Sequence, residues 1–172
     1  MNPIQVARKD ENMQNYQHKV LTNLFDTGFG VKYETNLSAY TPPHWHAAME
    51  LLLFVKGSVT CKFEHFTLRA KAGELYLINS HEVHETRCSR DAVYLCVHIQ
   101  PNMMCRYVPN FDQLRFSLAH SPEDSEKAAA YGQLRQYMQK ILQDAQQENA
   151  ISRLECQSSL FGAVALLVKH FS

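Results

Sequence analysis

Two histidines and a glutamate stand directly before the most apolar stretch of this chain. His44, His46 and Glu50 precede or open the segment ELLLFV at residues 50–55. Alternate residues of a strand share a face, so His44 and His46 are expected to point the same way, and Glu50 joins them after a short irregular step. Two imidazoles and a carboxylate that converge suit a first-row metal with nitrogen and oxygen ligands. The pattern predicts either a metal site or a polar wall for a small molecule.

A fourth ligand of such a metal is expected from a neighbouring strand. The segment from Gly73 to His84 offers one, because His84 follows an apolar strand-like run. His81 lies three residues earlier and could compete with His84 for the same place. The sequence therefore predicts a cluster of His44, His46, Glu50 and one further histidine.

Length and charge exclude several classes of protein. A chain of 172 residues is one domain, or a domain with a helical appendage. Its 17 basic and 17 acidic residues cancel, so no DNA contact is expected from this chain. The start lacks the apolar core of a signal peptide, and the longest apolar runs fall short of the roughly 20 residues that span a bilayer. We therefore expect a cytoplasmic protein without membrane contact.

The five cysteines are an odd number and include no C-x-x-C pair. This argues against a disulfide framework and against a zinc knuckle. We expect them to be small buried hydrophobes in a reducing compartment.

Short strand-like runs separated by turn signals predict a β-sandwich or barrel over residues 26–115. A polar N-terminal arm at residues 1–25 precedes it. The expected strands cover residues 33–37, 50–55, 59–68, 74–78 and 92–100, and one of the expected turns covers residues 41–43.

The spacing of apolar residues becomes helical after residue 120. Ser121 as N-cap and Pro122 at the first helical position predict a helix start, and a break at Glu148-Asn149 precedes a second helix. Two helices joined by a short link pack antiparallel, so residues 120–172 are expected to form a hairpin. Its apolar stripes exceed what one sheet face needs, and the remainder suits a second copy of the chain. The residues expected at a dimer interface are Met138, Leu142, Leu160 and Phe161.

Strand parity predicts part of the barrel lining. If Glu50 faces inward, Phe54 does too, and the alternate apolar set that begins at Leu51 faces outward, where the helices are the simplest cover. Over residues 92–100 one face carries Tyr94, Cys96 and His98, and parity leaves open which face points inward. The expected effector contacts are His44, His46, Glu50, Phe54, Tyr76 and His98.

Both polar motifs resemble those of the cupins. His44-x-His46-x3-Glu50-x6-Gly57 is similar to most of the first cupin motif, and Gly73 followed eleven residues on by His84 is similar to the second. The resemblance implies a mainly β fold, a jelly-roll barrel, with His44, His46, Glu50 and His84 as ligands of a divalent metal such as Zn, Ni, Fe or Mn. The departures from the usual motif residues are Ser38, Asn79, His81 and Cys88. Metal binding and an effector-orienting role of the histidines both stay open.

Within the cupins, the sequence more closely resembles the N-terminal sensor domain of AraC-type transcription regulators. The resemblance rests on the strand ending in Lys56-Gly57-Ser58, on residues 73–78 (GELYLI), on Val93-x-Leu95-x-Val97-x-Ile99 and on the two closing helices. Such regulators bind a small effector in the barrel, dimerise through the helices and carry a DNA-binding helix-turn-helix part later in the chain. The resemblance implies a non-enzymatic sensing and dimerisation domain, with the DNA-binding part absent from this chain.

Two other functions stay open at this point. A stand-alone metal-dependent cupin enzyme, such as a dioxygenase or an isomerase, would use the four-residue cluster, although no general base or oxygen-activating group stands beside it. A sugar-binding module without a regulatory partner is the other. An apolar barrel with a few polar groups accepts sugars, aromatic acids and amines alike, so the effector itself is not predicted.

Overall fold

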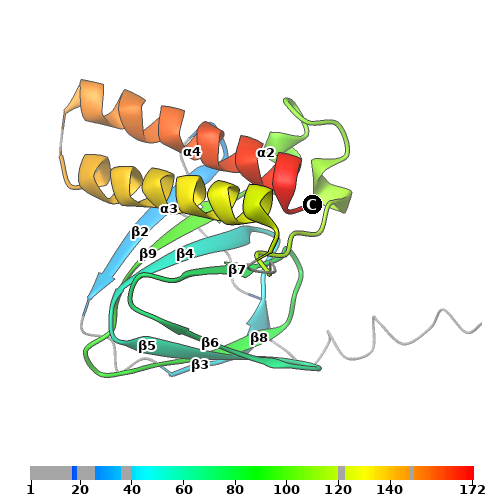
Figure 1. Cartoon of the computed structure of the whole chain (residues 1–172). Helices are drawn as coiled ribbons and strands as arrows, with labels where there is room; N and C mark the ends of the chain where they lie inside the picture. The colour runs from blue at the N-terminus through cyan, green and yellow to red at the C-terminus, as the bar shows by residue number, and fades with distance from the viewer. Residues whose placement is uncertain (1–16, 19–25, 36–39, 120–122, 148) are drawn as a thin grey trace, which may run out of the picture.

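Two facing β-sheets and a pair of long helices make up most of the described part of the chain (Figure 1). The computed structural model describes residues 17–18, 26–35, 40–119, 123–147 and 149–172. The first sheet has the order β1 (Gln17–His18), β3 (Tyr40–Trp45), β8 (His84–Cys88), β5 (Ser58–Phe63), β6 (Thr67–Lys71). The second has the order β2 (Phe29–Thr35), β9 (Val93–Ile99), β4 (Met49–Lys56), β7 (Leu75–Ile78). The predicted mainly β barrel followed by helices is confirmed.

Strand β4 carries apolar side chains on both faces because both faces are covered. Leu52 and Phe54 belong to the core between the sheets, whereas Leu51 and Leu53 belong to the core beneath the helices. This alternation was predicted, but Val55 is 44% exposed, so the helical cover ends before it.

The register between β4 and β9 settles which face of β9 points inward. Leu51 lies opposite Val97 and Leu53 lies opposite Leu95, and all four belong to the core beneath the helices. The alternate residues Tyr94, Cys96 and His98 therefore face the barrel interior. Sequence parity alone had left this choice open.

Helices α3 (Ser125–Ala145) and α4 (Ala150–His170) lie antiparallel across the outer face of the second sheet (Figure 1). The Asp124 carboxylate caps α3 by accepting from the Lys127 N–H at 3.0 Å. The Asn149 side chain caps α4 by accepting from the Ser152 N–H at 2.9 Å, which confirms the predicted break. Two short helical pieces, α2 (Pro101–Met104) and η1 (Phe111–Gln113), connect β9 to this pair.

Several predicted boundaries were wrong. The expected turn at residues 41–43 lies inside β3. The register of β3 against β8 shifts between Thr41 and His44, and such an irregularity accommodates the two prolines because they lack an N–H. The strand expected at 59–68 is the hairpin of β5 and β6, and the helix expected from Ser121 begins at Ser125. Some predictions fall outside the described residues. These are the motif departure at Ser38, the helix cap at Ser121 and Pro122, and the N-terminal arm at 1–25 apart from β1.

The helices bury two of the four residues expected at a dimer interface. Met138 and Leu160 are 0% and 1% exposed in the core against the second sheet, so neither can form the seam itself. Leu142 and Phe161 are half-buried at its edge, and Phe161 packs edge-on against Phe29 at 5.1 Å. By length and composition α4 could cross a membrane, a test that core helices of soluble proteins also pass.

Gly57, between β4 and β5, gives a testable prediction about the barrel corner. Its φ is +77°, and a Cβ there would lie 2.4 Å from Ser89 Oγ and 2.8 Å from Ala92 Cα. Gly73, with φ +87° and nothing within 4 Å of such a Cβ, is a matched control. Both alanine substitutions carry left-handed strain of about 1–2 kcal/mol. Gly57→Ala should lower the free energy of unfolding by about 1–3 kcal/mol more, because backbone must also move.

Urea denaturation of the two variants measures this difference. Equal losses for Gly57→Ala and Gly73→Ala would contradict the close approach at Gly57.

Candidate functional site

A cavity of about 330 Å³ lies between the two sheets. This volume falls within the range of small-molecule sites. All six predicted effector contacts line it: His44, His46, Glu50, Phe54, Tyr76 and His98. Residues that sequence reasoning did not single out as contacts also line it, among them Thr41, Thr86 and Tyr94.

Three buried histidines form one wall of the cavity. His44 and His84 are directly opposite each other on β3 and β8, with ring centroids 4.3 Å apart. His46 follows β3, and its ring lies 5.6 Å from that of His44 and 5.2 Å from that of His84. One ligand atom from each ring lies within 4.8 Å of the others. His81 does not join them: it is exposed, with φ +59°, and its ring lies 5.7 Å from Trp45.

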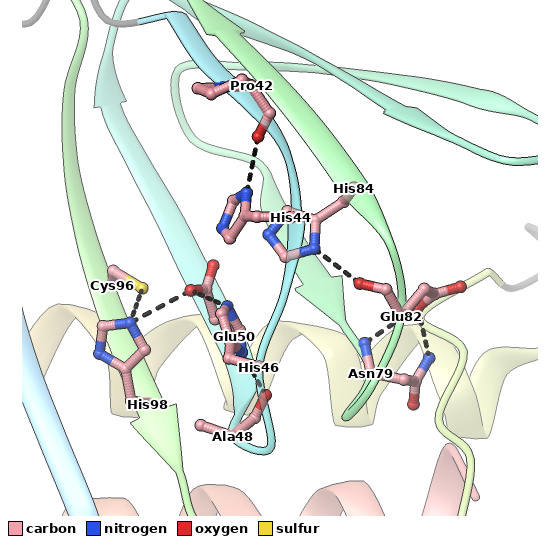
Figure 2. Close-up of polar contacts among 10 residues, drawn as sticks. All are labelled: Pro42, His44, His46, Ala48, Glu50, Asn79, Glu82, His84, Cys96 and His98. Atoms are coloured by element: carbon pink, nitrogen blue, oxygen red, sulfur yellow. Dashed lines mark hydrogen bonds and ion pairs between the residues drawn. The ribbon is translucent and has the colours of Figure 1, made fainter. Parts of the chain in front are cut away.

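Backbone carbonyls fix the orientation of all three rings (Figure 2). The Nδ1 of His44 lies 2.9 Å from the Pro42 oxygen, and those of His46 and His84 lie 2.8 Å from the oxygens of Ala48 and Glu82. A carbonyl only accepts hydrogen bonds, so each Nδ1 carries a proton. Each ring is therefore anchored through its Nδ1, an arrangement also found in histidines that ligate a metal through Nε2.

The opposite wall carries the carboxylate of Glu50. Glu50 and His98 are directly opposite each other on β4 and β9, and His98 Nε2 lies 3.1 Å from Glu50 Oε1. Cys96 Sγ lies 3.6 Å from the same His98 nitrogen (Figure 2). Glu50 Oε1 also lies 2.9 Å from His46 Nε2.

Burial and hydrogen bonding set the charge of these groups. Burial raises the pKa of Glu50, but hydrogen bonds from His46 and His98 outweigh it and hold that pKa well below 4.5. Burial lowers the pKa of His84, which favours its neutral, metal-binding form. Burial raises the pKa of Cys96 well above 9 and that of Cys61 to about 12, so both are thiols at neutral pH. The wall of the second sheet thus presents the Glu50 anion beside the neutral Cys96 thiol.

The donors present fit a divalent metal. Three imidazole nitrogens on one side and a carboxylate on the other are the ligand types that Zn²⁺ and its neighbours accept. The structure brings the four predicted residues together: His44, His46 and His84 converge with one another, and Glu50, which converges with Cys96 and His98, also meets His46. A bound metal would supply a Lewis acid with coordination positions open to the cavity.

The turn before His84 is tied to the segment that leads into the helices. The Asn79 side chain accepts from the Phe116 N–H at 2.8 Å and donates to the Phe116 oxygen at 3.1 Å. Glu82 accepts from the Asn79 N–H at 3.1 Å and, through its own carbonyl, holds His84. Asn79, which departs from the usual second motif, therefore helps to position the site.

The chain belongs to the family described as the AraC-like ligand binding domain, whose model matches residues 31–164. It is 23% identical over 97 residues to YdeC of Bacillus subtilis strain 168, described as an uncharacterized HTH-type transcriptional regulator. That match covers 55% of this chain and 33% of the regulator, so the chain spans about a third of its relative's length.

Similar solved structures include cupins. A cupin-2 domain containing protein from Shewanella frigidimarina has 17% identity and a TM-score of 0.40, over 52% of this chain and 89% of that one. The Cnp3 cupin domain of Schizosaccharomyces pombe has 16% identity and a TM-score of 0.41, over 52% and 70%. These likenesses say nothing about ligand or activity.

The ionised Glu50 gives a prediction about acid stability. Because its folded-state pKa is depressed, its contribution to stability is present above the unfolded value near 4.5 and is lost as the pH falls through the folded value. Wild type should therefore exceed Glu50→Gln in free energy of unfolding most at neutral pH, and the difference should shrink as the pH falls below about 4.5.

Urea denaturation across this pH range is the measurement. Glu64→Gln, which alters an exposed carboxylate in the β5–β6 turn, is the control and should show no such convergence. Parallel curves for wild type and Glu50→Gln would contradict the assignment.

Proposed function

We propose that this chain is the effector-sensing and dimerisation domain of an AraC-type transcription regulator, without catalytic activity of its own. The observation that carries the proposal is the cavity in the barrel, with buried polar groups on two facing walls, in a member of the AraC-like ligand binding family. The similarity of the chain to YdeC, which is described as an HTH-type transcriptional regulator, supports the same role.

DNA would be bound by a helix-turn-helix part of the parent protein outside this chain. The zero net charge supports the absence of DNA contact by this domain, since phosphate contacts need clustered Lys and Arg. The apolar stripes of α3 and α4 are buried against the sheet, so neither helix is free to enter a groove. The compartment we propose is the cytoplasm.

The effector we propose is a small molecule with polar groups on opposite sides. On one side it would meet the histidines and on the other Glu50 and His98. Between them, the rings of Phe54 and Tyr94 lie 5.2 Å apart and offer an apolar surface. Strand β4 carries Phe54 into the cavity and Leu53 into the helical core, so it connects the effector site to the helices.

A divalent metal, such as Zn, Ni, Fe or Mn, is the cofactor we propose for this cavity, held near His44, His46, Glu50 and His84. The fixed Nδ1 atoms of the three histidines support this, because each ring is oriented before a metal arrives. The same three histidines favour the second candidate function, a metal-dependent cupin dioxygenase or isomerase. That function would be established by conversion of a substrate by the metal-loaded protein.

Dimerisation is proposed through the solvent face of the helical pair. Ile151 and Leu154 on α4 are 66% and 64% exposed, and Leu142 and Phe161 are half-buried beside the core. A two-fold arrangement is the commonest way to cover such a face with a second copy.

Effector binding predicts a thermal shift that depends on the barrel interior. A ligand that binds only the folded state stabilises it by about 2.7 kcal/mol at one hundred times its Kd. A melting-temperature screen of small polar metabolites should yield at least one hit, and Phe54→Leu should weaken it. Val55→Leu, at the exposed neighbouring position on β4, should leave it unchanged. A hit insensitive to Phe54 and Glu50 substitutions would place the site outside the barrel.

Dimerisation predicts that a charge on the outer face of the helical pair separates the subunits. Wild type should be a dimer at micromolar concentration by light scattering, and Leu154→Glu or Leu142→Glu should give monomers, because burying a carboxylate at the seam is costly. Gln143→Glu, at an exposed polar position of α3, is the matched control. A monomeric wild type would refute the dimer, and a dimer unaffected by both variants would place the interface elsewhere.

A further inference from the structure

We propose that a connector segment, residues 115–117 between η1 and α3, couples the effector cavity to the C-terminal end of α4, with Asn79 and Arg115 as positioning residues for the turn that presents His84. The inference rests on the effector-sensing function proposed above and adds a route from the barrel to the helices. Within the connector segment Arg115 and Phe116 are hydrogen-bonded to the turn, whereas Ser117 is hydrogen-bonded to the end of α4.

The turn at residues 79–83, between β7 and β8, is hydrogen-bonded to two of the histidines that line the cavity. The Glu82 oxygen accepts from His84 Nδ1 at 2.8 Å (Figure 2). The His81 N–H donates to the His46 oxygen at 2.9 Å. Movement of this turn would therefore displace His46 and His84 together on the histidine wall of the cavity.

Two side chains hold the turn against the connector segment. The Asn79 amide accepts from the Phe116 N–H at 2.8 Å and donates to the Phe116 oxygen at 3.1 Å. The Arg115 guanidinium donates to the Ser80 oxygen at 2.9 Å and lies 3.8 Å from Glu82 Oε1. Because the Arg115 side chain is 59% exposed, its ion pair with Glu82 contributes little, and the three hydrogen bonds set the position of the turn.

The last residue of the connector segment holds the end of α4. The Ser117 N–H donates to the oxygen of Phe171, which is the C-cap of α4, at 2.9 Å. Phe116 is buried and packs against Phe111, with ring centroids 5.4 Å apart. Consecutive Cα atoms are about 3.8 Å apart across a planar peptide, so Phe116 cannot shift far without moving Ser117. One short piece of chain therefore holds both the turn and the end of α4.

This route reaches a different part of the helical pair from the contact made by β7. The Leu75 N–H meets the Tyr131 hydroxyl near the start of α3, whereas the connector segment meets Phe171. In the proposed regulator the DNA-binding part would be joined after α4, so a displacement of Phe171 would act on the chain that leads to it. Energetic coupling between two sites is reciprocal, so loosening the end of α4 should also loosen the turn.

Amide hydrogen exchange of the full 172-residue chain, followed by NMR without any ligand, tests the coupling. Ser117→Pro removes the N–H that donates to the Phe171 oxygen. It should raise the exchange rate of the His81 amide at least about 10-fold more than that of the Leu53 amide, which lies in β4 and reports on global unfolding. Ala119→Pro, whose lost N–H meets the Ser117 hydroxyl rather than α4, is the matched control and should not change this ratio.

Asn79→Ala tests the opposite direction. Loss of both hydrogen bonds to Phe116 should raise the exchange rate of the Phe171 amide, again relative to that of Leu53. Asn102→Ala, at an exposed asparagine of α2, is the control and should leave the Phe171 amide as in wild type.

Phe171→Leu serves if Ser117→Pro fails to fold, and it should raise the His81 rate in the same way. Its control is Ile141→Val, which trims the same core at the other end of the helical pair. A His81 rate that stays unchanged, or rises only as much as the Leu53 rate, would mean that the connector segment only stabilises the fold, and would overturn the inference. Coupling in one direction only would overturn it as well.

The exchange experiment uses no ligand, so its failure would leave the sensing function to the thermal-shift screen. Failure of that screen would in turn remove the effector without removing a measured coupling between the turn and α4.

Discussion

The interior of this barrel depends on the contacts of one largely buried carboxylate with two imidazoles. Glu50 gives up hydration, and that loss is offset only because His46 and His98 supply hydrogen bonds from two sides. His46 directly follows β3 of one sheet and His98 lies on β9 of the other, so a single side chain links the two walls. Removing either partner would leave a buried charge with less compensation, which is why the three residues form one unit.

The same strand that carries Glu50 also builds the helical layer. Along β4, alternate residues enter the barrel and the core beneath α3 and α4, as Leu52 and Leu53 do. A second connection runs from β7, where the Leu75 N–H donates to the Tyr131 hydroxyl of α3 at 2.9 Å. A ligand that moves β4 or β7 would therefore press directly on the helices that we propose for dimerisation, without any intermediate layer.

Departures from the usual cupin motif have structural roles in this chain. Asn79 replaces the common proline and anchors the turn before His84 to the segment ahead of the helices. His81 replaces the common glycine, adopts the left-handed conformation in that turn and stays at the surface beside Trp45. His84 of the second motif thus lines the cavity, and the turn that presents it is held by Asn79 and places His81 at the surface. Motif residues by themselves say little about whether a metal is bound, because the same rings also suit an effector.

The sequence by itself determined the fold class, the two helices, the inward face of β4 and the six residues around the cavity. These follow from local rules: strand parity, helical spacing and capping act over a few residues and need no distant partner. It failed at β3, where two prolines are typical of a turn although the segment pairs with β8. It also did not predict that Met138 and Leu160 are buried in the core beneath the helices, because that depends on how the helices pack on the sheet. Only the tertiary structure placed His98 against Glu50, because that pairing depends on the register of two strands more than forty residues apart in sequence. Register between distant strands is fixed by the packing of whole sheets, and no single segment of the chain encodes it.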